Sequence, residues 1–303
     1  MDLVLVSLAF LLIALVSGNN LQACSGSVIG SRILSKRRGI ALAIMGYIAG
    51  FILEGGFLRK GLFSAMPNTM ASFTEIALVI SVIIFMVAHK MRVPQSLSMT
   101  FFLALLGANL AMGEGINTVS VGIIVVFWIA ATIISMFATG WVLRCFSKML
   151  YNRRVWRSVR SIKALLILMS FITAFTLGAN TIGLVFASTP GGLSYYAIFI
   201  LAIITGSIGL SSGELKRVNM EIIPLRYLNA LVTQTVSTTM VEIATLAGIP
   251  LSNTQTYTAS VYGAGLGYRT RILLRKPALI ILKIWIGTAI ASLVFGYILA
   301  LIW

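Results

Sequence analysis

Two polar breaks in apolar stretches are the residues of this chain whose types and spacing could do chemistry. Gly18-Asn19-Asn20 lies inside the apolar segment 3–33, and Gly178-Ala179-Asn180 lies inside a second one. A helix over 3–33 would be about 45 Å long, well over the roughly 30 Å hydrocarbon core of a bilayer. Carboxamides behind a glycine therefore predict an interrupted helix. Irregular backbone is tolerated at that depth only where it is buried in protein or lines a watery cavity.

Each break is followed, further along the chain, by a proline and a run of hydroxyl or amide side chains. These runs are Pro94-Gln95-Ser96-Leu97-Ser98 and Pro250-Leu251-Ser252-Asn253-Thr254. Hydroxyls and carboxamides both donate and accept hydrogen bonds. The N-terminus of a half-helix adds free N–H groups and a positive dipole end, which suit an oxyanion. Such a site could hold a tetrahedral oxyanion without a permanent charge on the protein.

We expect the four clusters to form one anion site. The expected ligands are Asn20, Ser96, Ser98, Asn180, Thr181, Ser252 and Thr254. For any single one of them, the plainer interpretation is that small polar residues let membrane helices pack and bond across their interfaces. The occurrence of the clusters twice, in the same order, favours a binding site.

Carboxylates are scarce, so each one in an apolar run matters. Only seven acidic residues are present, and an ionisable residue within a membrane span is a functional hypothesis by default. Glu54 and Glu242 are the candidates for binding a coupling ion, Na⁺ or H⁺, and the carboxamides of Asn253 and Gln255 join them. Glu54 precedes two glycines near the end of its run, so a solvated interfacial carboxylate is the alternative there. We expect no metal or other cofactor.

The composition is that of a polytopic membrane protein. Hydrophobic residues make up 59% of the 303 residues and charged residues 10%, with a mean hydropathy of +1.01, and no soluble class fits these values. The net charge of +16 does not indicate nucleic acid, because Lys and Arg accumulate in cytoplasmic loops. One His and two Cys supply neither a disulfide framework nor the nucleophile and base of an enzyme.

Ten apolar runs of spanning length predict about ten transmembrane helices. They cover residues 2–31, 38–58, 71–89, 93–113, 117–143, 164–187, 194–212, 222–248, 250–268 and 277–302. The runs 93–113 and 250–268 are rich in Gly and Ser and open on a proline. For these two, a re-entrant hairpin or a pair of half-helices is an alternative to a full span.

The basic residues predict the topology. If each run crosses once and the N-terminus is outside, most of the 23 Lys and Arg lie inside. They include Lys90, Arg92 and a basic linker, 144–163. The positive-inside rule then predicts a multi-pass protein of the cell membrane with both termini outside and a cytoplasmic linker.

An internal repeat relates the segment 1–143 to the segment 164–303. Asn20 and Asn180 are 160 residues apart, the two prolines 156, and Trp128 and Trp285 157. Because five crossings per repeat is an odd number, the second copy must be inverted relative to the first. Inverted repeats with interrupted helices are the architecture of secondary transporters, which hold substrate and ions near the midplane of the membrane.

These motifs resemble those of the inorganic phosphate transporter (PiT) family of phosphate permeases. Its members carry, once per repeat, a Gly-Ala-Asn-Asp break and a Pro-Val-Ser-Thr-Thr-His segment. The corresponding stretches here are Gly18-Asn19-Asn20-Leu21, Gly178-Ala179-Asn180-Thr181, Ser96-Leu97-Ser98-Met99 and Ser252-Asn253-Thr254-Gln255. Glu54 and the Trp128 and Trp285 segments also match family positions, so the resemblance covers nearly the whole chain in order.

Four side chains depart from the family pattern. Leu21 and Thr181 stand where the family has aspartate, and Met99 and Gln255 stand where it has histidine. The resemblance implies that those aspartates bind cation and phosphate. Their replacement therefore puts sodium coupling in question and leaves sulfate, which relatives carry, as an alternative substrate.

We therefore expect an all-α secondary active transporter that moves an inorganic oxyanion, phosphate first, by alternating access coupled to Na⁺ or H⁺. The alternatives are a sulfate permease of the same family, a membrane sensor that binds the anion without transporting it, and a channel. The lipid bilayer is an expected partner, nucleic acid is not, and a homo-oligomer stays open.

Overall fold

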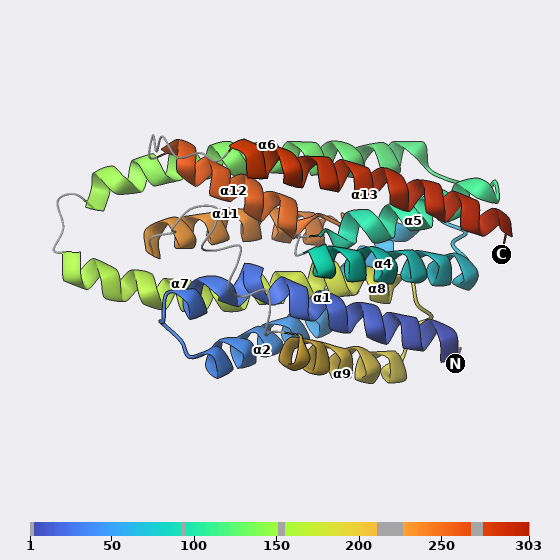
Figure 1. Ribbon diagram of the computed structural model, residues 1–303, viewed down its shortest axis with the longest axis horizontal. Helices are drawn as coiled ribbons and strands as arrows, with labels where there is room; N and C mark the ends of the chain where they lie inside the picture. The colour runs from blue at the N-terminus through green and yellow to red at the C-terminus, as the bar shows by residue number, and fades with distance from the viewer. Residues whose placement is uncertain (1–2, 92–94, 151–154, 211–226, 268–274, 303) are drawn as a thin grey trace.

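The computed structural model describes residues 3–91, 95–150, 155–210, 227–267 and 275–302 (Figure 1). Over these residues the regular structure is entirely helical, which confirms the expected all-α class. The elements are α1 (Leu3–Gly30), α2 (Lys36–Glu54), α3 (Phe57–Ala65), α4 (Ala71–Met91), α5 (Leu97–Ala111), α6 (Thr118–Leu150), α7 (Val155–Leu177), the π-helical turn η1 (Gly178–Ile182), α8 (Gly183–Ala187), α9 (Leu193–Gly209), α11 (Tyr227–Leu246), α12 (Asn253–Gly267) and α13 (Arg275–Ile302).

The described helices make the chain a multi-pass membrane protein. Five of them are long and apolar enough to cross a bilayer, and the pair α2–α3, bent by 61°, is a sixth if it counts as one span. The helices α5 and α12 have 15 residues each in their described extent, about 22 Å, which is short of the roughly 30 Å core. This length favours the half-helix alternative for the runs 93–113 and 250–268. The total of ten crossings stays a prediction.

The half-length helices belong to two helical pairs that lie in opposite halves of the molecule. The helix α4 packs against α5, and α11 packs against α12. In Figure 1 the first pair lies toward the end that holds both termini, and the second lies toward the other end. The two termini thus share one end, whereas the side of the membrane on which they lie stays a prediction.

Helix packing follows one pattern in the two halves of the chain, 1–143 and 164–303. The helix α1 packs against α9 as α7 packs against α2; α5 packs against α13 as α12 packs against α6; and α1 packs against α4 as α7 packs against α11. Each of these contacts therefore has a counterpart in which the segments 1–143 and 164–303 exchange roles.

The expected interruption of the first helix at Gly18 is wrong, because α1 is α-helical from Leu3 to Gly30. Gly18 instead permits close packing: a Cβ there would lie 2.5 Å from the Cβ of Leu210. At the second break the helix widens into η1 without ending, and a Cβ on Gly178 would lie 2.1 Å from the carbonyl oxygen of Tyr47. Small residues at helix contacts let backbones approach in a membrane, and the intrahelical hydrogen bonds are retained.

The basic segment 144–163 is not a loop in its described part. The helix α6 continues to Leu150 and α7 begins at Val155, at the end of the molecule opposite the termini (Figure 1). With 33 residues, α6 is about 50 Å long, so part of it must extend beyond a roughly 30 Å core. Lys90 likewise lies in the last turn of α4, not in a loop, and Arg92 lies outside the described residues.

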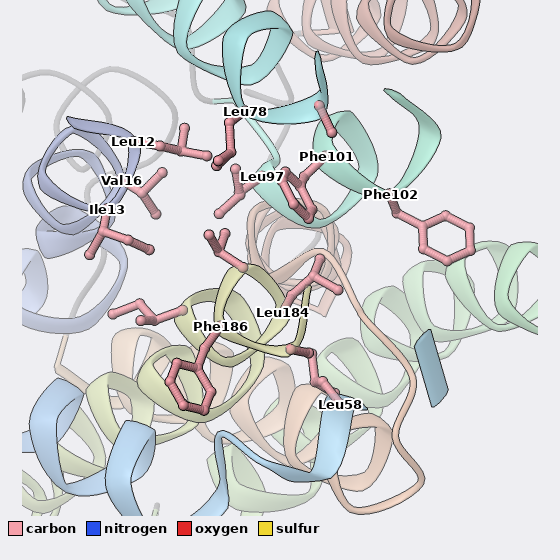
Figure 2. Packing of buried hydrophobic residues seen from close by; sticks show 14 of the residues in the cluster. Leu12, Ile13, Val16, Leu58, Leu78, Leu97, Phe101, Phe102, Leu184 and Phe186 are labelled. Atoms are coloured by element: carbon pink, nitrogen blue, oxygen red, sulfur yellow. The ribbon is translucent and has the colours of Figure 1, made fainter. Parts of the chain in front are cut away.

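An apolar core packs α1 against the α4–α5 pair. Leu12, Ile13 and Val16 of α1 face Leu78 of α4 and Leu97 of α5 (Figure 2), and all five are almost fully buried. Membrane helices associate through close packing because lipid tails are as apolar as the side chains. This core therefore holds α1 in place by the fit of its side chains.

Candidate functional site

The N-terminal ends of α5 and α12 meet at the candidate site. Ser98 Oγ donates a hydrogen bond to the carbonyl oxygen of Leu251 at 3.1 Å. Thr254 Oγ1 donates to the carbonyl oxygen of Gln95 at 3.2 Å. The two donors are 156 residues apart in the chain, and so are the two acceptors. Each contact is therefore the repeat counterpart of the other. The reciprocal pair holds two half-length helices together by their N-termini.

Each helix begins at a buried serine. Ser96 Oγ accepts a hydrogen bond from the Met99 N–H at 3.3 Å, and Ser252 Oγ accepts one from the Gln255 N–H at 3.3 Å. A capping serine uses a lone pair in this bond and keeps its own proton to donate. The first N–H groups of a helix lack intrahelical partners and carry the positive dipole end. The arrangement can therefore hold an anion between the two ends.

Asn180 holds the turn before α12. Its Nδ2 donates to Thr245 Oγ1 at 2.9 Å and to the Ile249 carbonyl at 3.2 Å, and its Oδ1 accepts from the Leu251 N–H at 3.1 Å. Asn180 is fully buried, and its carboxamide is occupied by these contacts. Asn180 therefore positions the site, and neighbouring Thr181 is buried beside it in η1.

Asn20 differs from its counterpart. Its side chain is half-buried, and its backbone carbonyl accepts a hydrogen bond from the Cys24 thiol at 3.5 Å. Within the described residues, the Asn20 carboxamide has no hydrogen-bond partner. The described contacts thus join Ser98, Thr254 and Asn180 at the helix ends and do not connect Asn20 to them.

The two expected coupling carboxylates come together from α2 and α11. Glu54, the last residue of α2, lies within hydrogen-bonding reach of Glu242 on α11, and Thr176 Oγ1 of α7 donates to Glu242 Oε2. Glu54 Oε2 is buried and without a partner among the described residues. Two carboxylates this close repel each other unless a proton or a cation lies between them. The pair is therefore suited to binding one positive ion.

Asn253 and Gln255, the other two coupling candidates, lie elsewhere. Both are in the first turn of α12, and Asn253 Oδ1 accepts from Ser237 Oγ of α11 at 3.3 Å. They belong with the helix ends instead of the carboxyl pair. Among the described residues, no group of three His, Cys, Asp or Glu side chains could hold a metal ion.

Two site residues were not identified from the sequence. Gln95 Nε2 donates to Thr100 Oγ1 at 2.8 Å and to Thr288 Oγ1 at 3.0 Å, which ties the start of α5 to α13. Its position just before Ser96 was the available signal. Thr176 precedes Asn180 by four residues, the spacing that puts two side chains on one helix face.

Comparison with known proteins extends over the whole chain. No family model matches the sequence. The chain is 24% identical over 292 residues to a "putative phosphate permease" of Methanocaldococcus jannaschii, and the match covers 96% of this chain and 94% of that protein. A solved structure described as "The sodium-dependent phosphate transporter" matches with a TM-score of 0.81 at 15% identity, over 99% of this chain and 98% of that one. At that identity the structural match shows the fold alone. The similarity thus extends over nearly the whole chain, in sequence to a protein named as a phosphate permease and in fold to a solved phosphate transporter.

Proposed function

We propose that this protein is a secondary active transporter that moves an inorganic oxyanion, phosphate, across the cell membrane. The observation that carries the proposal is the reciprocal contact of the two helix ends, Ser98 with Leu251 and Thr254 with Gln95. It brings two sets of unpaired N–H groups and two dipole ends to one place, where an anion can be held without a fixed positive charge. The names of the matched proteins make phosphate the first substrate to test.

Alternating access is the proposed mechanism. Packing contacts that recur with the halves exchanged support two repeats of opposite orientation. In such a protein the halves can exchange their arrangements, so that one central site opens first to one side and then to the other. The bias of Lys and Arg supports termini outside and a cytoplasmic segment 144–163.

The carboxyl pair Glu54–Glu242 is the proposed site of the coupling ion, H⁺ or Na⁺. Hydrogen bonds across the interface between α7 and α11 connect this carboxyl pair to the helix ends. Thr245, which bonds Asn180, follows Glu242 by three residues on α11. Occupancy of the carboxyl pair can therefore affect the turn that Asn180 holds.

Uptake by purified protein in proteoliposomes tests the proposal. Radiolabelled phosphate and sulfate are offered with a sodium gradient, with a pH gradient, and with neither. We expect one gradient to drive phosphate above its equilibrium distribution. Uptake of sulfate alone would favour a sulfate permease, binding without uptake a sensor, and passive equilibration a channel. Absence of both binding and uptake of either anion would refute the proposed function.

A further inference from the structure

Most polar side chains at the two helix ends already have their hydrogen bonds within the protein. Ser98 and Thr254 donate their protons to carbonyls of the opposite pair, and the Asn180 carboxamide is occupied at both of its atoms. These side chains stabilise the site. The groups that remain for a ligand must be sought among their neighbours.

Two carboxamides in the first turn of α12 retain unused capacity. Asn253 is 6% exposed, and its Nδ2 is buried without a partner in the described chain. Gln255 Oε1 is also buried without a partner there. A buried polar atom that lacks a hydrogen bond costs free energy unless a ligand supplies the partner.

The direction of helical side chains favours Gln255 for contact with an anion at the start of α12. Side chains of an α-helix lean back toward its N-terminus, so a residue of the first turn lies over the free N–H groups that an anion would bind. Gln255 follows the capping Ser252 by three residues. In a capping box the Gln at this position bonds back to the cap, but here its Oε1 is unpaired.

The two unpaired atoms require different partners. An N–H donor such as Asn253 Nδ2 can bond any oxyanion oxygen, whereas a carbonyl oxygen such as Gln255 Oε1 needs a hydrogen from its partner. Phosphate carries one or two protons near neutral pH, and sulfate carries none. A site built to bond a hydrogen rejects an analogue that lacks it, because the buried acceptor is then left unpaired.

We infer that Gln255 is a specificity-determining residue whose Oε1 accepts the hydrogen of a protonated oxyanion at the α12 N-terminus. The inference rests on the proposed function and assigns its site to hydrogen phosphate over sulfate. In the first repeat Met99 holds the position of Gln255 and has no strong hydrogen-bonding group. The selection therefore depends on α12 and not on α5.

The test compares Gln255→Met, which copies the first repeat, with Met99→Leu as the matched control. Dissociation constants for phosphate, arsenate and sulfate are measured on purified protein, separately from uptake. Arsenate keeps a proton at neutral pH as phosphate does. Loss of one hydrogen bond in Gln255→Met should raise the dissociation constants for phosphate and arsenate about tenfold. The dissociation constant for sulfate should change less than about twofold. Met99→Leu should leave all three constants unchanged.

A second variant separates recognition from folding. Gln255→Glu keeps an acceptor and adds negative charge, so it should still bind phosphate and should bind sulfate more weakly than the parent does. Equal weakening of phosphate and sulfate binding in Gln255→Met, or no change in the binding of either, would overturn the inference. A parent protein that binds sulfate more tightly than phosphate would also overturn it. Anion binding without gradient-driven uptake would instead refute the proposed transport. The dissociation constants would still test the selectivity.

Discussion

The α7–α11 interface and the α1–α4 interface occupy corresponding places in the two halves, and they differ in polarity. Three successive hydrogen bonds connect α7 and the following η1 to α11. They join Thr173 to Thr238 at 2.7 Å, Thr176 to Glu242, and Asn180 to Thr245 at 2.9 Å. Because their spacing follows the helical turn, the bonds form a ladder that leads from the carboxyl pair to the turn before α12.

The corresponding positions of α1 and α4 carry apolar side chains, of which all but the exposed Met86 are buried. Ile13 and Val16 precede Thr173 and Thr176 by 160 residues, and Val82 and Met86 precede Thr238 and Glu242 by 156. Ile13, Val16 and Val82 are buried, and Figure 2 shows Ile13 and Val16 within the apolar core. One interface thus carries hydrogen bonds and a carboxylate, and its counterpart carries packed apolar side chains.

Glu242→Gln should have the largest effect. The carboxamide keeps an acceptor for Thr176 but can carry neither the charge nor the transferable proton of a carboxyl group. We expect gradient-driven phosphate uptake in proteoliposomes to fall to background while phosphate binding persists. Met86→Gln, at the corresponding but exposed position of α4, should retain uptake. If both variants transported normally, the ladder would have no role in coupling.

Asn180→Ala should have the next largest effect, on stability. It leaves buried partners at Thr245, Ile249 and Leu251 without their bonds. At about 1–3 kcal/mol for each unsatisfied buried group, the expected loss is roughly 3 kcal/mol. Thermal unfolding in detergent measures this loss.

Asn20→Ala is the matched control for this change. Because the Asn20 carboxamide has no described partner, its removal should alter stability by less than about 0.5 kcal/mol. A loss of transport in Asn20→Ala would then come from the site and not from unfolding. Equal destabilisation by the two variants would contradict the difference between the two breaks.

Thr176→Val should have the smallest effect. It replaces the hydroxyl that bonds Glu242 with the side chain type found at Val16. Loss of one hydrogen bond to a charged group should shift the concentration of coupling ion that gives half-maximal uptake by roughly tenfold. The maximal rate should remain. An unchanged ion dependence would mean that Thr176 only packs between the helices.

Composition, periodicity and spacing alone determined the membrane class, the apolar runs and the paired polar clusters. These features are local, because the hydrophobicity of a segment and the preference of Ser for a helix start depend on neighbouring residues. Ser96 and Ser252 begin helices as their sequence context indicates. The repeat spacing also predicted that Ser98 and Thr254 belong to one site.

Only the tertiary structure decided what each polar side chain bonds. Asn20 and Asn180 look alike in sequence, yet one carboxamide is unpaired among the described residues and the other holds a turn. The close contact of α9 with Gly18 of the continuous α1 and the meeting of Glu54 with Glu242 on α2 and α11, which both pack against α7, also belong to the tertiary structure. Hydrogen-bond partners between helices depend on packing of segments far apart in the chain, which no local pattern specifies.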